Sequence, residues 1–115
     1  MKFREPIPFE EILTMILQKE DEGASYCIYS SILDSNELML KTICYIDDYP
    51  EIDDDDEEEI YSDFVNQNDL SLLFREELVQ DVIMNAVDQK QSVTNQELLD
   101  AICFYNKNDN FMKLF

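Results

Sequence analysis

The fold is decided by SYCIYSSIL at residues 25–33 and LMLKTICYI at residues 38–46. Both stretches are rich in β-branched and aromatic residues, a composition typical of strands. Between them, residues 34–37 read DSNE, a turn sequence of four residues. The pattern predicts an antiparallel hairpin. Both faces of its second strand carry apolar side chains, so one face should meet helices and the other a partner or a further strand.

An amphipathic pattern before the hairpin predicts a first helix over residues 8–20. Met15 lies off the apolar stripe of this helix, so we expect it to be exposed. Gly23 is the only glycine of the chain and follows the helix, where it could adopt the left-handed conformation that ends helices. The apolar stripe of the helix consists of Phe9, Ile12, Leu13, Ile16 and Leu17.

The second half of the chain reads as helical. A short helix is expected over residues 58–66, a longer one over 71–89 and a last one over 95–106. Thr94 and Glu97 have the spacing of a capping box at the start of the last helix. The apolar C-terminus, residues 111–115, could pack back onto the body. A helix, a hairpin, an acidic loop and a helical C-terminal half indicate an α+β fold in a single domain, residues 1–115.

An acidic connector, DDYPEIDDDDEEEIYSD at residues 47–63, joins the hairpin to the helical half. It holds eleven acidic residues and no Lys or Arg, within a chain of net charge −19. Like charges at this density repel one another, so the run should not fold into a core. Apolar residues on both sides of the run can pin its two ends to the body: Tyr49, Ile52, Ile60, Tyr61 and Phe64.

The charge of the whole chain restricts its partners. Nucleic acid is not expected to bind directly, because binding it requires Lys and Arg to displace counterions from phosphates. An anionic membrane surface is disfavoured by the same repulsion. A basic protein is the partner that this charge complements. We expect the partner-binding residues to be Asp47, Asp48, Tyr49, Glu51, Ile52, Asp53, Asp54, Asp55, Asp56, Glu57, Glu58, Glu59, Tyr61 and Asp63.

Most catalytic chemistry lacks its residues in this sequence. The chain has no histidine, which removes Ser-His-Asp and Cys-His arrangements and most zinc sites. No glycine-rich phosphate loop is present either. We therefore expect no enzyme, no cofactor and no catalytic or metal-binding residue. An EF-hand loop starting at Asp53 would need Gly and Glu where Glu58 and Phe64 stand. A weakly cation-binding acidic protein and a loop that only maintains solubility remain alternatives.

The cysteines indicate a reducing compartment. Cys27, Cys44 and Cys103 are odd in number and form no CxxC pair, as expected for buried thiols of a cytoplasmic protein. The first residues do not read as a signal peptide, and no apolar stretch is long enough for a membrane span.

Several short motifs resemble a family of small acidic bacterial immunity proteins, antitoxins of the contact-dependent growth inhibition type. The motifs are DVIMNA at residues 81–86, LLDAI at 98–102 and NDNF at 108–111, and TIC at 42–44 before the acidic run. The resemblance implies a cytosolic protein that occludes, by stoichiometric binding, the C-terminal toxin domain of a large exported protein, often an RNase or tRNA nuclease. It carries over no binding residue. The alternative is a phage or mobile-element inhibitor that mimics nucleic acid and blocks a host nuclease.

Overall fold

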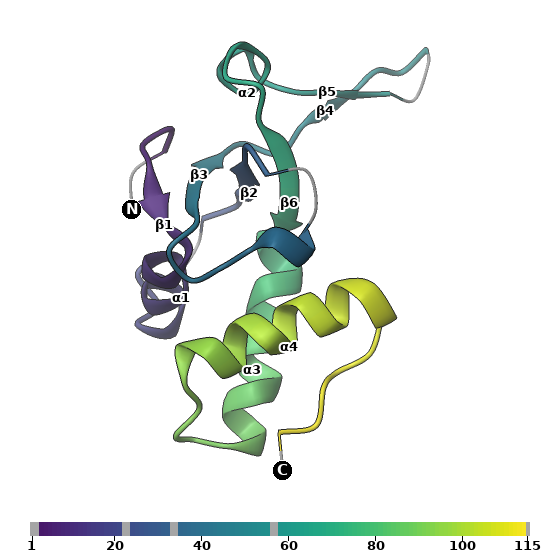
Figure 1. Cartoon of the computed structure of the whole chain (residues 1–115). Coiled ribbons are helices and arrows are strands. Elements are labelled where there is room, and N and C mark those ends of the chain that lie inside the picture. The colour runs from purple at the N-terminus through teal and green to yellow at the C-terminus, as the bar shows by residue number, and fades with distance from the viewer. Residues whose placement is uncertain (1–2, 22–23, 33–34, 56–57, 115) are drawn as a thin grey trace.

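The computed structural model of the chain describes residues 3–21, 24–32, 35–55 and 58–114. It is an α+β fold in which helices and antiparallel strands pack together (Figure 1). A 3₁₀ turn at Ser35–Glu37 lies between the second and third strands. The elements follow in the order β1 (Ile7–Pro8), α1 (Phe9–Leu17), β2 (Cys27–Ser30), β3 (Ile43–Asp47), β4 (Glu51–Ile52), β5 (Glu59–Ile60), α2 (Asp63–Gln67), β6 (Ser71–Arg75), α3 (Glu76–Gln89) and α4 (Asn95–Asn108).

The predicted hairpin is confirmed, with a longer connection than expected. β2 and β3 pair antiparallel, with Cys27 opposite Asp47. However, β3 begins at residue 43 and not at residue 38. Before it, the Met39 amide donates to the Thr42 hydroxyl at 2.8 Å, and the Thr42 amide donates to the Met39 carbonyl at 3.0 Å. This local turn uses backbone groups that a longer strand would need for its ladder.

Two strands of the main sheet were not expected from the sequence. The main sheet has the order β1-β3-β2-β6, so β1 and β6 flank the hairpin. The helix predicted over residues 71–89 was wrong at its start, because residues 71–75 form β6 and pair with β2. Phe74 of β6 lies in the core, and α3 begins directly after the strand. The helix predicted over residues 58–66 likewise lies later, at Asp63–Gln67, where the Ser62 hydroxyl caps it by accepting from the Val65 amide.

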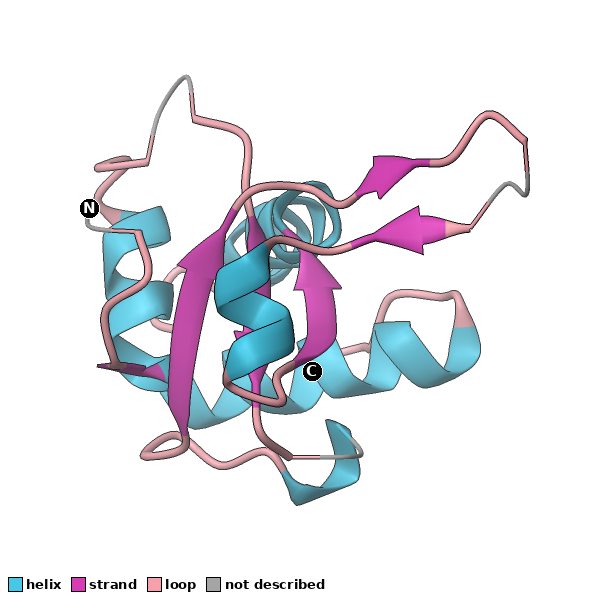
Figure 2. Cartoon of the chain, turned by 90° about the horizontal axis from the view of Figure 1, so that it is seen from above, coloured by secondary structure: helices cyan, strands magenta, loops and turns pink. Residues whose placement is uncertain are grey.

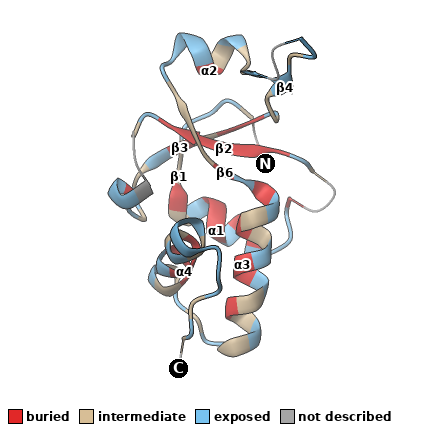
Figure 3. Cartoon of the chain, turned by 90° about the vertical axis from the view of Figure 1, so that its right-hand side faces the viewer, coloured by how far each residue is buried: buried red, intermediate tan, exposed pale blue. Residues whose placement is uncertain are grey.

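Both faces of the sheet are covered, which Figures 2 and 3 show from two directions. The main core lies between the sheet and helices α1, α3 and α4. On the opposite face, α2 lies over the strands and closes a smaller cluster around Cys27, Tyr29 and Val65. The face that was expected to meet a partner or another strand is therefore partly covered by the chain itself, while Ile43 of β3 stays 46% exposed.

Helix α1 buries a slightly different arc from the predicted one. Phe9, Ile12, Leu13 and Ile16 are buried as expected. Met15 is only 5% exposed, whereas Leu17 is 40% exposed. The expectation for Met15 was wrong, because the helix is rotated toward Met15 and away from Leu17. Leu17 is left beside α3, at the edge of a groove described below.

Three helices end on left-handed residues, and none of them is glycine. Gly23, the predicted terminator of α1, lies outside the described residues. The turn that ends α1 is made by Lys19, with φ 59°. The Lys19 amide donates to the Ile16 carbonyl and the Glu20 amide to the Met15 carbonyl, both at 3.0 Å, which is the Schellman arrangement. Asp69 and Asp109 take the same conformation after α2 and α4.

The predicted capping box is confirmed at the start of α4. The Glu97 amide donates to the Thr94 hydroxyl at 3.1 Å, and the Thr94 amide donates to the Glu97 carboxylate at 3.0 Å. The described part of the C-terminus returns to the body as expected. The Leu114 amide donates to the Gln89 side chain at 3.0 Å, while Phe115 lies outside the described residues. Over the described ranges, no helix has both the length and the apolar content that crossing a bilayer requires.

Candidate functional site

The acidic connector contains a short β-ribbon that projects from the body (Figures 1 and 2). β4 and β5 pair antiparallel, with Glu51 opposite Ile60 and Ile52 opposite Glu59. Toward the tip, the Asp53 amide donates to the Glu58 carbonyl at 2.9 Å. We call residues 48–61 the acidic ribbon. The expected loop is thus partly a strand pair, because uncharged backbone groups can pair while the carboxylates point into water.

A buried carboxylate fastens the base of the ribbon. Asp47, the last residue of β3, has no exposed surface. Its Oδ1 accepts from the Arg4 guanidinium at 3.0 Å and from the Asp48 amide at 2.8 Å. Its Oδ2 accepts from the Ser62 hydroxyl at 2.5 Å. Burial opposes ionisation, but the bonds from Ser62, the Asp48 amide and Arg4 hold the pKa of Asp47 below its usual range. Asp47 therefore joins the outgoing and returning strands of the connector.

Aromatic side chains fix the same base against the sheet. The buried Tyr29 hydroxyl donates to the Asp48 carbonyl at 2.7 Å. The phenol stays neutral, so it adds no charge to the ribbon base. Burial raises the pKa of Tyr29 well above its ordinary value. Tyr61 packs edge-on against Tyr29, with ring centroids 6.1 Å apart. The ribbon thus leaves the body from a packed aromatic base. Of the residues expected to pin it, Tyr49, Tyr61 and Phe64 pack there, whereas the expectation was wrong for Ile52 and Ile60, which are exposed.

An ion pair holds the returning strand to β6. The Arg75 guanidinium donates to the Glu59 carboxylate at 2.7 Å, and the Tyr61 hydroxyl donates to the other Glu59 oxygen at 2.6 Å. The bond from Tyr61, together with Arg75, holds the pKa of Glu59 below its usual range. The same bond to Glu59, helped by burial, raises the pKa of Tyr61 to about 12.

A weaker contact reaches from the ribbon to α3. The Tyr49 hydroxyl donates to the Glu76 carboxylate at 3.4 Å. Glu76 is 6% exposed at the first turn of α3, and burial followed by the charge of Glu77 raises its pKa. Burial, and next the charge of Glu76, raise the pKa of Tyr49 to about 12. The tyrosine proton is therefore retained and available to this carboxylate at neutral pH.

The predicted site residues divide into anchors and exposed groups. The assignment of Asp47 to a partner surface was wrong, because its carboxylate is buried and used inside the fold. Tyr49 and Tyr61 are half-buried and pack at the base of the ribbon. Asp53 is also half-buried, near the tip of the ribbon. Asp56 and Glu57 lie outside the described residues. The exposed predicted residues are Asp48, Glu51, Ile52, Asp54, Asp55, Glu58, Glu59 and Asp63.

Three further residues shape the ribbon and were not assigned to the site. Ile60 is 49% exposed and lies opposite Glu51, so an apolar side chain projects among the acids. Its place beside the acidic run could have indicated this. Arg4 and Arg75 hold the base, and neither carried a signal, because each pairs with an acid distant in the sequence. Among the described residues, Glu59 is the one ribbon carboxylate in an ion pair.

The described acids of the ribbon do not converge on a point. In the parts of the chain that the structure describes, no three side chains of Asp, Glu, Cys or His are grouped as metal ligands. The carboxylates instead spread along a projecting hairpin. Chemically, such an arrangement can pair with cations that a partner presents over an extended surface.

The fold and its ribbon define a small α+β protein with an acidic hairpin anchored to its core. The chain belongs to the family described as Domain of unknown function (DUF7716), whose model matches residues 9–114. The matched range contains the whole acidic ribbon and begins after Arg4. No curated protein and no solved structure matches the chain.

Proposed function

We propose that this protein is a cytoplasmic immunity protein that acts by binding and not by catalysis. Its acidic ribbon docks on the basic surface of a nuclease toxin domain and blocks access of RNA or DNA. The observation that carries the proposal is the ribbon itself. Its exposed carboxylates project from the body, while Asp47, Tyr29 and the Glu59–Arg75 pair hold its base.

The electrostatics of the ribbon support a basic protein partner. A dense group of exposed carboxylates steers an oppositely charged partner and fixes the orientation in which it docks. Ile52 and Ile60 are 63% and 49% exposed among these charges. Apolar anchors surrounded by charge are the arrangement in which interfaces combine affinity with fast association.

A nuclease is the class of basic partner that these properties favour. Its substrate cleft must attract phosphates, so a row of carboxylates can occupy the same cleft. The resemblance of residues 81–86 and 98–102 to contact-dependent growth inhibition immunity proteins points to the same class. Cys27 and Cys44 form no disulfide, which is consistent with a reducing cytoplasm.

The direct test is to capture the partner from the cell that makes this protein and to identify the product of the neighbouring gene. We expect a basic nuclease domain that binds one copy of the chain and loses activity when bound. A partner without nuclease activity would contradict the immunity function. A host defence nuclease encoded elsewhere would favour the nucleic-acid mimic instead.

A matched pair of variants tests the ribbon. In the ribbon-neutral variant, Asp53, Asp54, Asp55 and Glu58 are replaced by Asn or Gln. In the control variant, the same number of exposed carboxylates outside the ribbon is neutralised at Glu5, Glu11, Asp81 and Asp100. Both variants have the same net charge. We expect affinity and its salt dependence to fall much more in the ribbon-neutral variant. Equal losses would mean that overall charge and not the ribbon selects the partner.

A further inference from the structure

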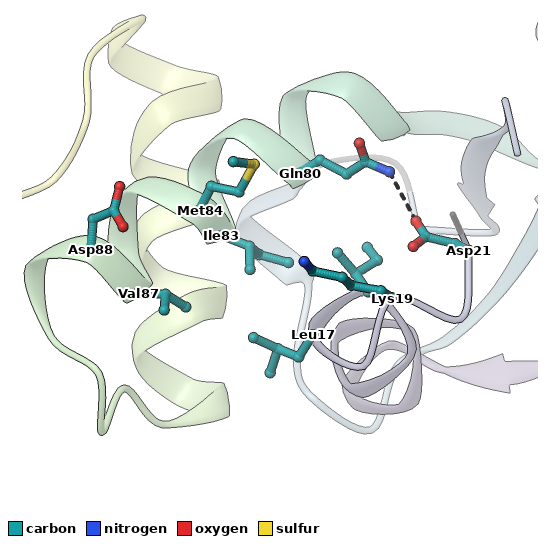
Figure 4. Close-up of a pocket in the computed structure, with 9 residues that line it drawn as sticks. Leu17, Lys19, Asp21, Gln80, Ile83, Met84, Val87 and Asp88 are labelled. Carbon is teal, nitrogen blue, oxygen red and sulfur yellow. Dashed lines mark hydrogen bonds between the residues drawn. The ribbon is translucent and has the colours of Figure 1, made fainter. Parts of the chain in front are cut away.

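A groove of about 500 Å³ lies between the end of α1 and the outer side of α3 (Figure 4). Its walls are mainly apolar, with Leu17 on one side and Ile83, Met84 and Val87 on the other. Leu17 is 40% exposed and Met84 is 67% exposed. The volume lies in the range of small-molecule sites, which are mostly apolar with a few placed polar groups. We call this feature the α1–α3 groove; it uses no residue of the acidic ribbon.

One end of the groove is closed by a satisfied acid. Asp21 is 3% exposed, and its Oδ2 accepts from the Gln80 side chain at 3.0 Å and from the Tyr26 hydroxyl at 2.5 Å. Figure 4 shows Gln80 reaching across from α3 to Asp21. These bonds join the two walls beyond the helix end and compensate the buried carboxylate. The groove is therefore held open by a fixed contact.

Lys19 is the basic residue among those that line the groove. Figure 4 shows its ammonium group extended toward Ile83, over the apolar wall. Lys19 forms no ion pair with any described residue, although Arg4, Lys41, Arg75 and Lys90 each do. It also occupies the left-handed position after α1, where glycine would fit without steric cost. A lysine at this position directs a positive charge over an apolar surface.

We propose that the α1–α3 groove binds a monocarboxylate with a linear apolar chain. The chain would lie against Leu17, Ile83 and Val87, and the carboxylate would pair with the Lys19 ammonium. Apolar burial supplies affinity, and Lys19 selects the charge of the head group. One negative charge fits better than two, because only Lys19 attracts an anion, whereas Asp21 and Asp88 line the same groove and repel one. This site is independent of the proposed immunity function.

The test is a titration of the full chain, followed by amide resonances, with octanoate, octanol and octylammonium as probes. We expect all groove residues to shift with octanoate, and octanoate to bind about three- to tenfold more tightly than octanol. Lys19→Ala should abolish that preference and leave octanol binding unchanged. Lys107→Ala, which removes an exposed cation outside the groove, should keep the preference.

Three results would overturn the proposal. Equal binding of octanoate and octanol would show an apolar groove with no head-group selection. Tighter binding of octylammonium would assign the groove to cations through Asp21 and Asp88. No shift with any probe would leave the groove to another protein surface, and a dependence of the same resonances on protein concentration would identify a second copy of the chain.

Discussion

The helices α1, α2 and α4 are each followed by a residue in the left-handed conformation. None of these residues is glycine, so each side chain adds a steric cost at its position. Asp69 and Asp109 tolerate this conformation because a short polar side chain can bond locally. Lys19 has no such compensation, since its side chain extends away over the α1–α3 groove. Lys19 therefore lowers the free energy of unfolding at a position from which its ammonium group lines the α1–α3 groove.

Replacing Lys19 separates these two effects. We expect Lys19→Gly to raise the free energy of unfolding by about 0.5–1 kcal/mol, because glycine accepts a positive φ although it gains entropy in the unfolded chain. Lys19→Ala should give no such gain, since alanine keeps the Cβ. Urea unfolding of the three proteins measures the difference. Equal stability of the Gly and Ala variants would mean that the left-handed position is not strained.

Asp47 is the second residue whose role depends on its surroundings. We expect Asp47→Asn to lower the free energy of unfolding by about 1–3 kcal/mol, because an amide cannot accept from all the donors around this buried group. Asp48→Asn, at the exposed neighbour, should change it little. Urea unfolding at neutral pH measures both variants.

The effect of Asp47 should also depend on pH in a definite direction. The pKa of Asp47 is lower in the folded protein than its ordinary value of 3.8, so the carboxylate stabilises the fold above that pH. This contribution is lost as the pH falls through the folded pKa. The gap between wild type and Asp47→Asn should therefore be constant at neutral pH and narrow below pH 3.8. A gap that widens in acid would contradict the assigned charge state.

At the scale of elements, the sequence predicted those features that depend on residues close together along the chain. The stripe of α1, the capping box of α4 and the β2–β3 pairing were readable, because each depends on neighbours along the chain. β6 was not, because it runs into α3 without an intervening turn residue and pairs with a strand far back in the sequence. The residues that anchor the ribbon were not predicted for the same reason, since Arg4 and Asp47 come into contact only in the folded chain.

Tyr29 tests whether the body holds the ribbon. We expect Tyr29→Phe to lower the free energy of unfolding by about 1 kcal/mol, because it removes the donor to the Asp48 carbonyl and keeps the ring. Amide exchange should accelerate in β4 and β5 more than in β2 and β3. Tyr45→Phe is the control, because the Tyr45 ring packs on Phe64 and not on the Tyr29–Tyr61 pair at the ribbon base. Unchanged exchange in the ribbon would show that packing alone holds it.

At the scale of the whole molecule, the acidic residues fall into two groups. One group is adjacent in the sequence, and the other is scattered along the chain. The connector at residues 47–63 carries eleven of the acids, and they are close together whether the chain is folded or unfolded. Their mutual repulsion therefore changes little on unfolding. Acids such as Glu5, Glu11, Asp81 and Asp100 come from distant parts of the sequence, so compaction of the chain brings each of them nearer to the other charges of the body. Repulsion that destabilises the fold should arise mainly from such scattered groups.

The matched charge variants test this division without any partner. Because salt screens repulsion beyond a Debye length of about 8 Å at physiological ionic strength, we expect added salt to raise the melting temperature of the wild type. Neutralising Asp53, Asp54, Asp55 and Glu58 should alter the free energy of unfolding by no more than about 0.5 kcal/mol and leave most of that salt response. The control variant at Glu5, Glu11, Asp81 and Asp100 should reduce the response more. If the ribbon-neutral variant instead lost the salt response, the ribbon would repel the body on which it is anchored. Its charge would then impose a folding cost, and the docking role would have to outweigh it.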